Sequence, residues 1–150
     1  MGKNLWLICL AAALCVTACK GPEPGKLVQL SEACGKELDP PPNGELQRVS
    51  VEGYLAIPAG AFLMCSDTCG LELRATPSDT KGLRIDVRIG SGKNRMAKLP
   101  KKYQESDLVV TTAEGKEVSV GSKIRVTGRR LGTAADKTCQ IYDVDLIQGA

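Results

Sequence analysis

The sequence has no histidine, and aromatic residues make up only 3% of its 150 residues. Without imidazole, the chain lacks the commonest general acid and base, the usual activator of a serine or cysteine nucleophile, and a frequent metal ligand. Its serines do not lie in a nucleophile-elbow motif. The scarcity of aromatic rings also leaves few platforms on which nucleic-acid bases can stack. We therefore predict a protein without catalytic activity, cofactor or bound metal, with oligonucleotide binding as a remote alternative only.

Strong charge and long hydrophobic runs are lacking as well. The chain has 20 Lys and Arg against 17 Asp and Glu, and a net charge of +3 is too small to require a polyanionic partner. The apolar run from Leu5 to Ala18 has only fourteen residues, whereas a membrane-spanning helix needs about 20. With Lys3 before it, this run is typical of a secretory signal peptide. The mature protein is therefore expected outside the cytoplasm.

The apolar run ends in Val16-Thr17-Ala18-Cys19, which resembles the lipobox of bacterial lipoproteins. The resemblance implies a signal peptide over residues 1–18 and a diacylglyceryl group on the sulfur of Cys19. Two or more acyl chains anchor a protein stably, because each buried methylene contributes about 0.8 kcal/mol. Lys20 follows the cysteine where an inner-membrane protein would have Asp, which implies the outer membrane if the source is a diderm bacterium. A secretory signal cut without lipidation is the alternative.

Four cysteines remain after the signal peptide and the lipidated residue are set aside: Cys34, Cys65, Cys69 and Cys139. An even number in an exported chain predicts two disulfides, for which three pairings are possible. A structural zinc site usually has close C-x2-C pairs, and a redox-active dithiol has two intervening residues and opens a helix. Here only Cys65 and Cys69 are close, with three residues between them. We favour a bond between them across a tight loop, which leaves Cys34 for Cys139.

The rest of the chain divides into a tether and one domain. Residues 19–45 are rich in proline and glycine and are predicted to form a flexible tether, with a short helix or turn over residues 27–35. From residue 46 to 150, apolar and polar residues alternate with a period of two, which predicts strands with one buried face. The expected strand regions are 49–57, 71–75, 83–89, 108–112 with 118–120, 124–128 and 140–148. Between the third and the fourth, residues 94–106 are expected to form one or two short helical turns, the first capped by Asn94 and the second begun by Pro100.

This pattern resembles an OB-fold. The first strand of such a barrel must bend to serve both sheets, and Gly53 lies inside the expected first strand. The stretches 120–128 (Val-Gly-Ser-Lys-Ile-Arg-Val-Thr-Gly) and 141–147 (Ile-Tyr-Asp-Val-Asp-Leu-Ile) are similar to the fourth and closing strands of bacterial OB-fold domains of the tRNA-anticodon-binding-like group. The resemblance implies a mainly β protein with a small five-stranded OB-like barrel over residues 46–150. An immunoglobulin-like β-sandwich is the alternative, although it needs about seven strands and no helical insert.

Basic residues are the candidate ligand contacts, because OB-folds often bind oligonucleotides or oligosaccharides on the face of strands 2 and 3 and in the adjoining loops. Charges on solvated strands and loops also serve solubility, which is the competing interpretation. A tethered domain works at high effective concentration near its own membrane, so weak contacts with an anionic glycan, a lipid head group or a protein partner suffice. The candidates, with Lys101 and Lys102 expected to be the first contacts, are Arg84, Arg88, Lys93, Arg95, Lys98, Lys101, Lys102, Arg129 and Arg130. The sequence thus predicts an envelope lipoprotein that acts as a non-catalytic binding module, with a purely structural envelope lipoprotein as the alternative.

Overall fold

A computed structural model describes residues 21–42, 44–60, 63, 65–135 and 138–150; the predicted signal peptide and Cys19 lie outside these residues. The elements in the described part are β1 (Lys26–Val28), η1 (Leu30–Glu32), η2 (Lys36–Leu38), β2 (Arg48–Ala56), β3 (Thr68–Arg74), β4 (Leu83–Arg88), β5 (Arg95–Met96), η3 (Glu105–Asp107), β6 (Val109–Thr111), β7 (Glu117–Ser119), β8 (Lys123–Leu131) and β9 (Gln140–Gly149). The three η elements are single 3-10 turns. In the described residues there is no helix with the length and apolar character needed to cross a bilayer.

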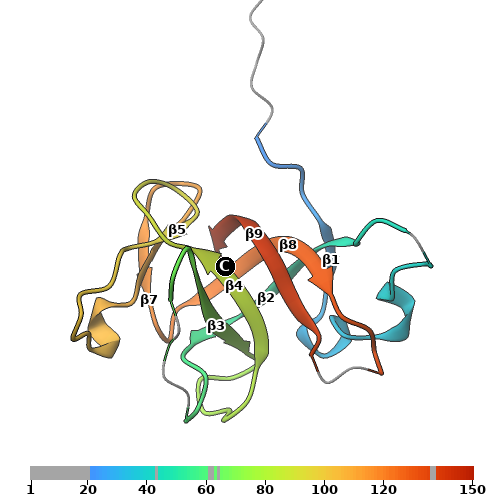
Figure 1. Cartoon of the computed structure of the whole chain (residues 1–150), viewed down its shortest axis with the longest axis horizontal. Helices are drawn as coiled ribbons and strands as arrows, with labels where there is room; N and C mark the ends of the chain where they lie inside the picture. The colour runs from blue at the N-terminus through green and yellow to red at the C-terminus, as the bar shows by residue number, and fades with distance from the viewer. Residues whose placement is uncertain (1–20, 43, 61–62, 64, 136–137) are drawn as a thin grey trace, which may run out of the picture.

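Five strands of the described chain close into a barrel (Figure 1). β2 pairs antiparallel with β3, and β3 pairs antiparallel with β4. β4 then pairs in parallel with β9, β9 pairs antiparallel with β8, and β8 closes the ring on β2. One mixed sheet that closes on itself is the predicted OB-like barrel. It differs from an immunoglobulin-like sandwich, in which two antiparallel sheets pack face to face.

The period-two pattern of the strands builds the core. Along β4, Leu83, Ile85 and Val87 are buried while the alternate residues face outward, and β3 shows the same alternation. The barrel strands contribute inward side chains that are at most 1% exposed, among them Val49, Val51, Leu55, Leu71, Leu73, Ile85, Val87, Ile124, Val126, Ile141, Val144 and Ile147. Burying one such aliphatic side chain stabilises the fold by about 1.5–3 kcal/mol. The barrel interior is therefore filled by side chains, and a ligand has to bind outside it.

β2 serves both sides of the barrel, as expected of the first strand. It pairs with β8 along residues 48–54 and with β3 along residues 54–56. At Gly53, where β2 passes from one partner to the other, a methyl group would lie 3.0 Å from the backbone oxygen of Arg74 and 3.0 Å from Cβ of Leu73. The glycine therefore permits a close approach of β3 at this point.

Between β4 and β8 lies an insert whose three strands form a small sheet in the order β5-β6-β7. A short helical piece lies in this connection as predicted, but it is only η3, and residues 94–100 are not helical. Asn94 has a φ of 57°, and its Oδ1 accepts a hydrogen bond from the backbone N–H of Ile147 at 2.8 Å. Met96 is buried by pairing with Val110 of β6. Strand pairing thus buries the apolar side chain that suggested a helix.

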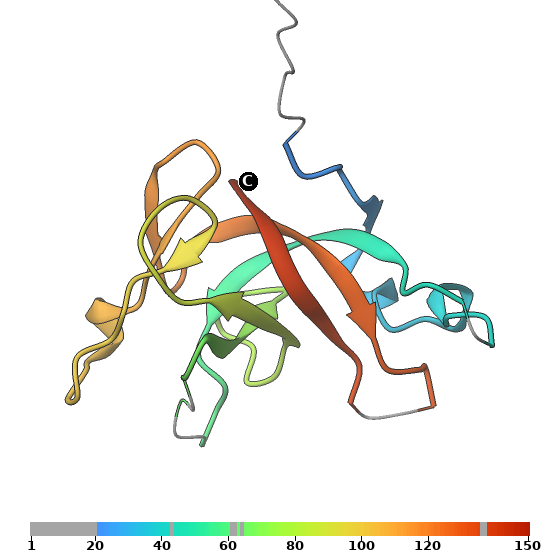
Figure 2. The same cartoon turned by 45° about the horizontal axis from the view of Figure 1, so that its top comes forward.

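The folded domain starts before the expected boundary at residue 46. β1 pairs in parallel with β2, with Lys26 opposite Val49 and Val28 opposite Val51. In the segment that follows, Ala33 and Leu38 are 0% and 3% exposed and belong to the core. The residues from 26 onward therefore belong to the domain rather than to a tether. This N-terminal segment, residues 26–39, and the insert lie at opposite ends of the barrel (Figures 1 and 2).

Candidate functional site

Both favoured cysteine pairs are bonded in the structure. Cys34 bonds Cys139, and Cys65 bonds Cys69. The second bond closes a loop in which the N–H of Ser66 donates to the carbonyl of Thr68 at 3.1 Å. The carbonyl of Asp67 in turn accepts a hydrogen bond from the N–H of Ile89 at 2.9 Å, so the loop is held against the end of β4. We call residues 65–69 the stapled loop.

The stapled loop forms one wall of an open hollow of about 580 Å³ near the insert. The end of β4, which pairs with the start of β3, and the first residues of the insert form the rest of its lining. The residues that line this basic hollow are Cys65, Ser66, Asp67, Thr68, Arg88, Ile89, Gly90, Arg95, Lys98 and Leu99. It lies beside the ends of the second and third barrel strands, where OB-folds carry their ligands.

Three of the predicted cations meet in the basic hollow, and two of them form no ion pair within the part of the chain that the structure describes. Arg88 forms an ion pair with Asp143 of β9. Arg95 is half-buried and Lys98 is exposed, and within the described residues neither forms an ion pair or a side-chain hydrogen bond. Gly90 has a φ of +150°, and a methyl group there would lie 3.4 Å from Cδ of Arg95. The glycine therefore leaves room for the arginine stem along the hollow.

Five other predicted cations lie outside the hollow. Arg84 pairs with Asp86 of the same strand, with 3.4 Å between Nε and Oδ1. Lys93 lies in the turn after β4. The pKa of Glu114 is lowered chiefly by a hydrogen bond with the Thr112 side chain, and the charge of Lys93 makes a smaller contribution. The remaining three are exposed, two between β5 and η3 and one on β8: Lys101, Lys102 and Arg129. The structure does not bring Lys101 and Lys102, the expected first contacts, to the lining of the hollow.

Arg130 is the one predicted contact that the structure removes from the surface. Its side chain is 0% exposed, and its Nη1 donates to the carbonyls of Leu38 at 3.1 Å and Gly132 at 2.7 Å. Its Nη2 lies 2.7 Å from Oδ1 of Asp39. Along β8 the side chains of Ile124 and Val126 face inward, and Arg130 follows the same phase into a space that the N-terminal segment covers. Arg130 is therefore a structural residue, and the prediction that it contacts a ligand is wrong.

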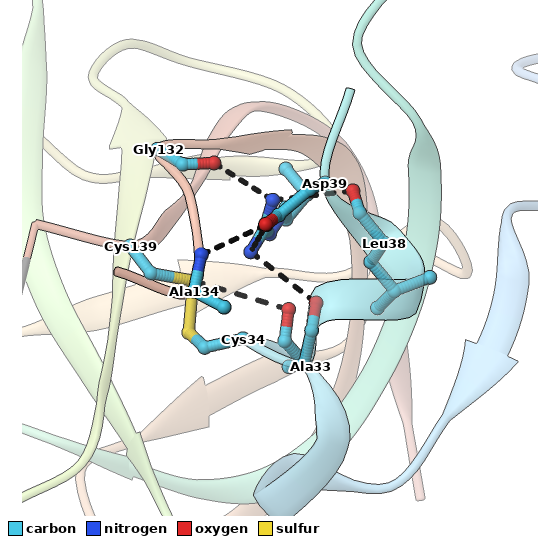
Figure 3. Close-up of a disulfide and its surroundings, with 9 residues drawn as sticks. Ala33, Cys34, Leu38, Asp39, Gly132, Ala134 and Cys139 are labelled. Carbon is cyan, nitrogen blue, oxygen red and sulfur yellow. Dashed lines mark hydrogen bonds and ion pairs between the residues drawn. A yellow bond between two sulfur atoms is a disulfide. The ribbon is translucent and has the colours of Figure 1, made fainter. Parts of the chain in front are cut away.

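The guanidinium of Arg130, the carboxylate of Asp39 and the carbonyls bonded to the guanidinium form one group, which we call the Arg130 cluster. Figure 3 shows Asp39, Leu38 and Gly132, which the guanidinium contacts, beside the disulfide between Cys34 and Cys139. Burial by itself raises the pKa of Asp39, but the hydrogen bond from the N–H of Ala134 and the contact with Arg130 outweigh it, so the pKa is lowered overall. Among the described residues, Nε of Arg130 has no hydrogen-bond partner. The cluster joins the N-terminal segment to the chain that follows β8.

Sequence reasoning did not single out Asp67, which brings a carboxylate to the basic hollow. Asp67 lies between Cys65 and Cys69. The disulfide expected between these two cysteines was the feature of the sequence that indicated a fixed position for it. The described residues hold no group of three or more Cys, Asp or Glu side chains arranged to bind a metal ion. The lining of the hollow offers charged side chains and hydrogen-bonding groups.

Comparison with known proteins does not identify the chain. Neither protein-family models nor curated proteins match it.

Proposed function

We propose that this protein is a membrane-anchored envelope lipoprotein whose barrel is a non-catalytic binding module, and that the basic hollow holds an anionic group of its ligand. The observation that carries the proposal is the placement of Arg95 and Lys98, neither of which forms an ion pair within the described residues, on one hollow with Arg88. A cation without an ion pair is available for charge-assisted hydrogen bonds to a carboxylate, sulfate or phosphate oxygen. The position beside the second and third barrel strands supports the same proposal.

The three cations have different parts in this binding. The ion pair with Asp143 orients the guanidinium of Arg88 before a ligand arrives. The fork of Arg95 fits two oxygens of one planar acid, whereas Lys98 contributes a point charge. Anchoring through Cys19 would hold the barrel close to envelope ligands, so that moderate affinity is sufficient.

The anion-binding proposal is tested with the mature chain from Lys20, which keeps every described element. Its backbone amides are followed by NMR during titration with three probes: inorganic phosphate, phosphatidylglycerol vesicles and oligogalacturonate. We expect at least one probe to shift the amides of residues 65–69 and 88–99 saturably. Replacing both free cations, Arg95→Glu with Lys98→Glu, should weaken that binding about tenfold or more, because attraction becomes repulsion.

The matched control is Lys101→Glu with Lys102→Glu, which makes the same change of charge outside the hollow. It should weaken binding by no more than about threefold, through the long-range field alone. Equal losses in the two variants would mean that general charge rather than the hollow attracts the ligand. The absence of a saturable shift with all three probes would overturn the proposal.

The anchor is tested separately. In cells fed labelled palmitate, the wild-type chain should incorporate the label, and Cys19→Ser should lack it and stay as the uncleaved precursor. Label in both chains, or in neither, would show that Cys19 is not lipidated.

A further inference from the structure

The basic hollow carries a negative charge as well as positive ones. Asp67 projects from the stapled loop between Ser66 and Thr68, and all three residues line the hollow. Asp67 is exposed, and within the described residues its carboxylate has no ion pair or hydrogen bond. A ligand in the hollow therefore meets the cations Arg95 and Lys98 and the carboxylate of Asp67 in one lining.

This combination restricts the ligand more than its positive charge does. An ionised carboxylate only accepts hydrogen bonds, so its partner must be a donor such as a hydroxyl or an ammonium group. A phosphate, whether free or in a nucleic-acid backbone, carries charge of the same sign as Asp67 and is repelled by it at close range. The hydroxyls of Ser66 and Thr68 can both donate and accept. The lining thus suits a molecule that joins an acidic group to neighbouring hydroxyls.

The remaining surface of the hollow fits the same molecule. Ile89 and Leu99 are half-buried and give the lining an apolar part, against which the C–H face of a sugar ring can pack. The volume of about 580 Å³ falls within the range of 300–1,000 Å³ that small-molecule sites usually have. The disulfide and the bond from Ile89 fix the Asp67 backbone before binding, which lowers the entropic cost of ordering the loop.

We infer that the ligand of the basic hollow is an acidic saccharide. Its carboxylate binds Arg95 and Lys98, and its ring hydroxyls donate to Asp67. This inference rests on the proposed function and names the class of ligand for the same hollow.

The test compares Asp67→Ala with Glu117→Ala, which removes an exposed carboxylate from β7, away from the lining. The side chain of Asp67 has no described partner, so its truncation should leave the fold intact. The probes are trigalacturonate, the corresponding neutral galactose trimer and inorganic phosphate. Asp67→Ala should weaken trigalacturonate binding about tenfold, since a hydrogen bond to a charged acceptor is lost. The same variant should bind phosphate about twofold more tightly, because the repelling charge is gone.

Glu117→Ala should change neither affinity by more than about twofold, and the neutral trimer should bind at least tenfold more weakly than trigalacturonate. If Asp67→Ala strengthens the binding of both trigalacturonate and phosphate, Asp67 only repels the ligand. The saccharide inference is then wrong, whereas the proposal of anion binding is unaffected. If vesicles of phosphatidylethanolamine bind in an Asp67-dependent manner and trigalacturonate does not, the donor is an ammonium group and the saccharide inference is wrong. If the Arg95→Glu and Lys98→Glu pair affects no probe, the proposed function itself fails.

Discussion

At one end of the barrel Arg130 is fully buried and bonded to Asp39 and to backbone carbonyls, whereas near the insert Arg95 and Lys98 line an open hollow without a described protein partner. Each site is bordered by a disulfide, and at each an arginine pairs with an aspartate from a distant segment, Arg130 with Asp39 and Arg88 with Asp143. Residue type is therefore not what separates them. A cation whose donors are satisfied inside the protein stabilises the fold, and a cation left without a partner at an open surface is available to a ligand.

The two disulfides should differ most clearly in stability. The bond between Cys34 and Cys139 spans 105 residues, whereas the bond between Cys65 and Cys69 spans four. Because a disulfide restricts the unfolded chain more when its loop is longer, replacing both Cys34 and Cys139 by Ala should cost about 4 kcal/mol. The same change at Cys65 and Cys69 should cost about 2 kcal/mol or less. Urea unfolding of the two double variants measures both values, and equal losses would contradict this account.

Two adjacent arginines give the next contrast. Arg130→Met removes one member of a buried ion pair and leaves the carbonyls of Leu38 and Gly132 without their donor. Such losses cost about 3–5 kcal/mol, and because Asp39 stays 31% exposed we expect about 3 kcal/mol. Arg129→Met, on the exposed face of the same strand, should change the free energy of unfolding by no more than about 0.5 kcal/mol. A loss below 1 kcal/mol for Arg130→Met would show that the cluster contributes little to stability.

The barrel strands were largely predictable because the alternation of apolar and polar residues that forms them lies within short stretches of sequence. Alternation over residues such as Leu83, Ile85 and Val87 gives both the strand and its buried face. The insert was less predictable, since the spacing of Met96 and Leu99 fits a helix, and only the partner strand β6 decides otherwise. Burial of Arg130 depends on residues 33–39 packing over the end of the barrel, about 90 positions away in the sequence. No local pattern contains that contact.

The candidate site was predictable in part for the same reason. Basic residues near the third strand could be named from the sequence, and Arg88, Arg95 and Lys98 were among them. Which cations would be neutralised depended on partners from distant strands, such as Asp143 beside Arg88. The selection of Arg95 and Lys98 over Lys101 and Lys102 follows from the turn at Gly90 and from the stapled loop, which are tertiary features.

The smallest expected effect is the pH dependence of the Arg130 cluster. Burial raises the pKa of Asp39, but the bond from Ala134 and the contact with Arg130 lower it by more. The pKa of Asp39 is lower in the folded than in the unfolded state. The ionised carboxylate therefore stabilises the fold at pH values above the ordinary pKa of aspartate. This stabilisation is lost as the pH falls through the lowered value. Between about pH 5 and pH 3, the urea midpoint of the wild type should therefore fall more steeply than that of Asp39→Asn.

Other carboxylates with lowered pKa values contribute the same background to both proteins, among them Glu52, chiefly through its hydrogen bond from Arg125. The sharper comparison repeats Asp39→Asn in the Arg130→Met background, where the partner charge is absent. There the two slopes should differ less, and the remaining difference reports the contributions other than Arg130, chiefly the bond from Ala134 and, to a lesser extent, the charge of Lys36. If Asp39→Asn flattens the slope equally in both backgrounds, Arg130 does not stabilise the Asp39 carboxylate. The guanidinium would then be held by the carbonyls of the cluster alone.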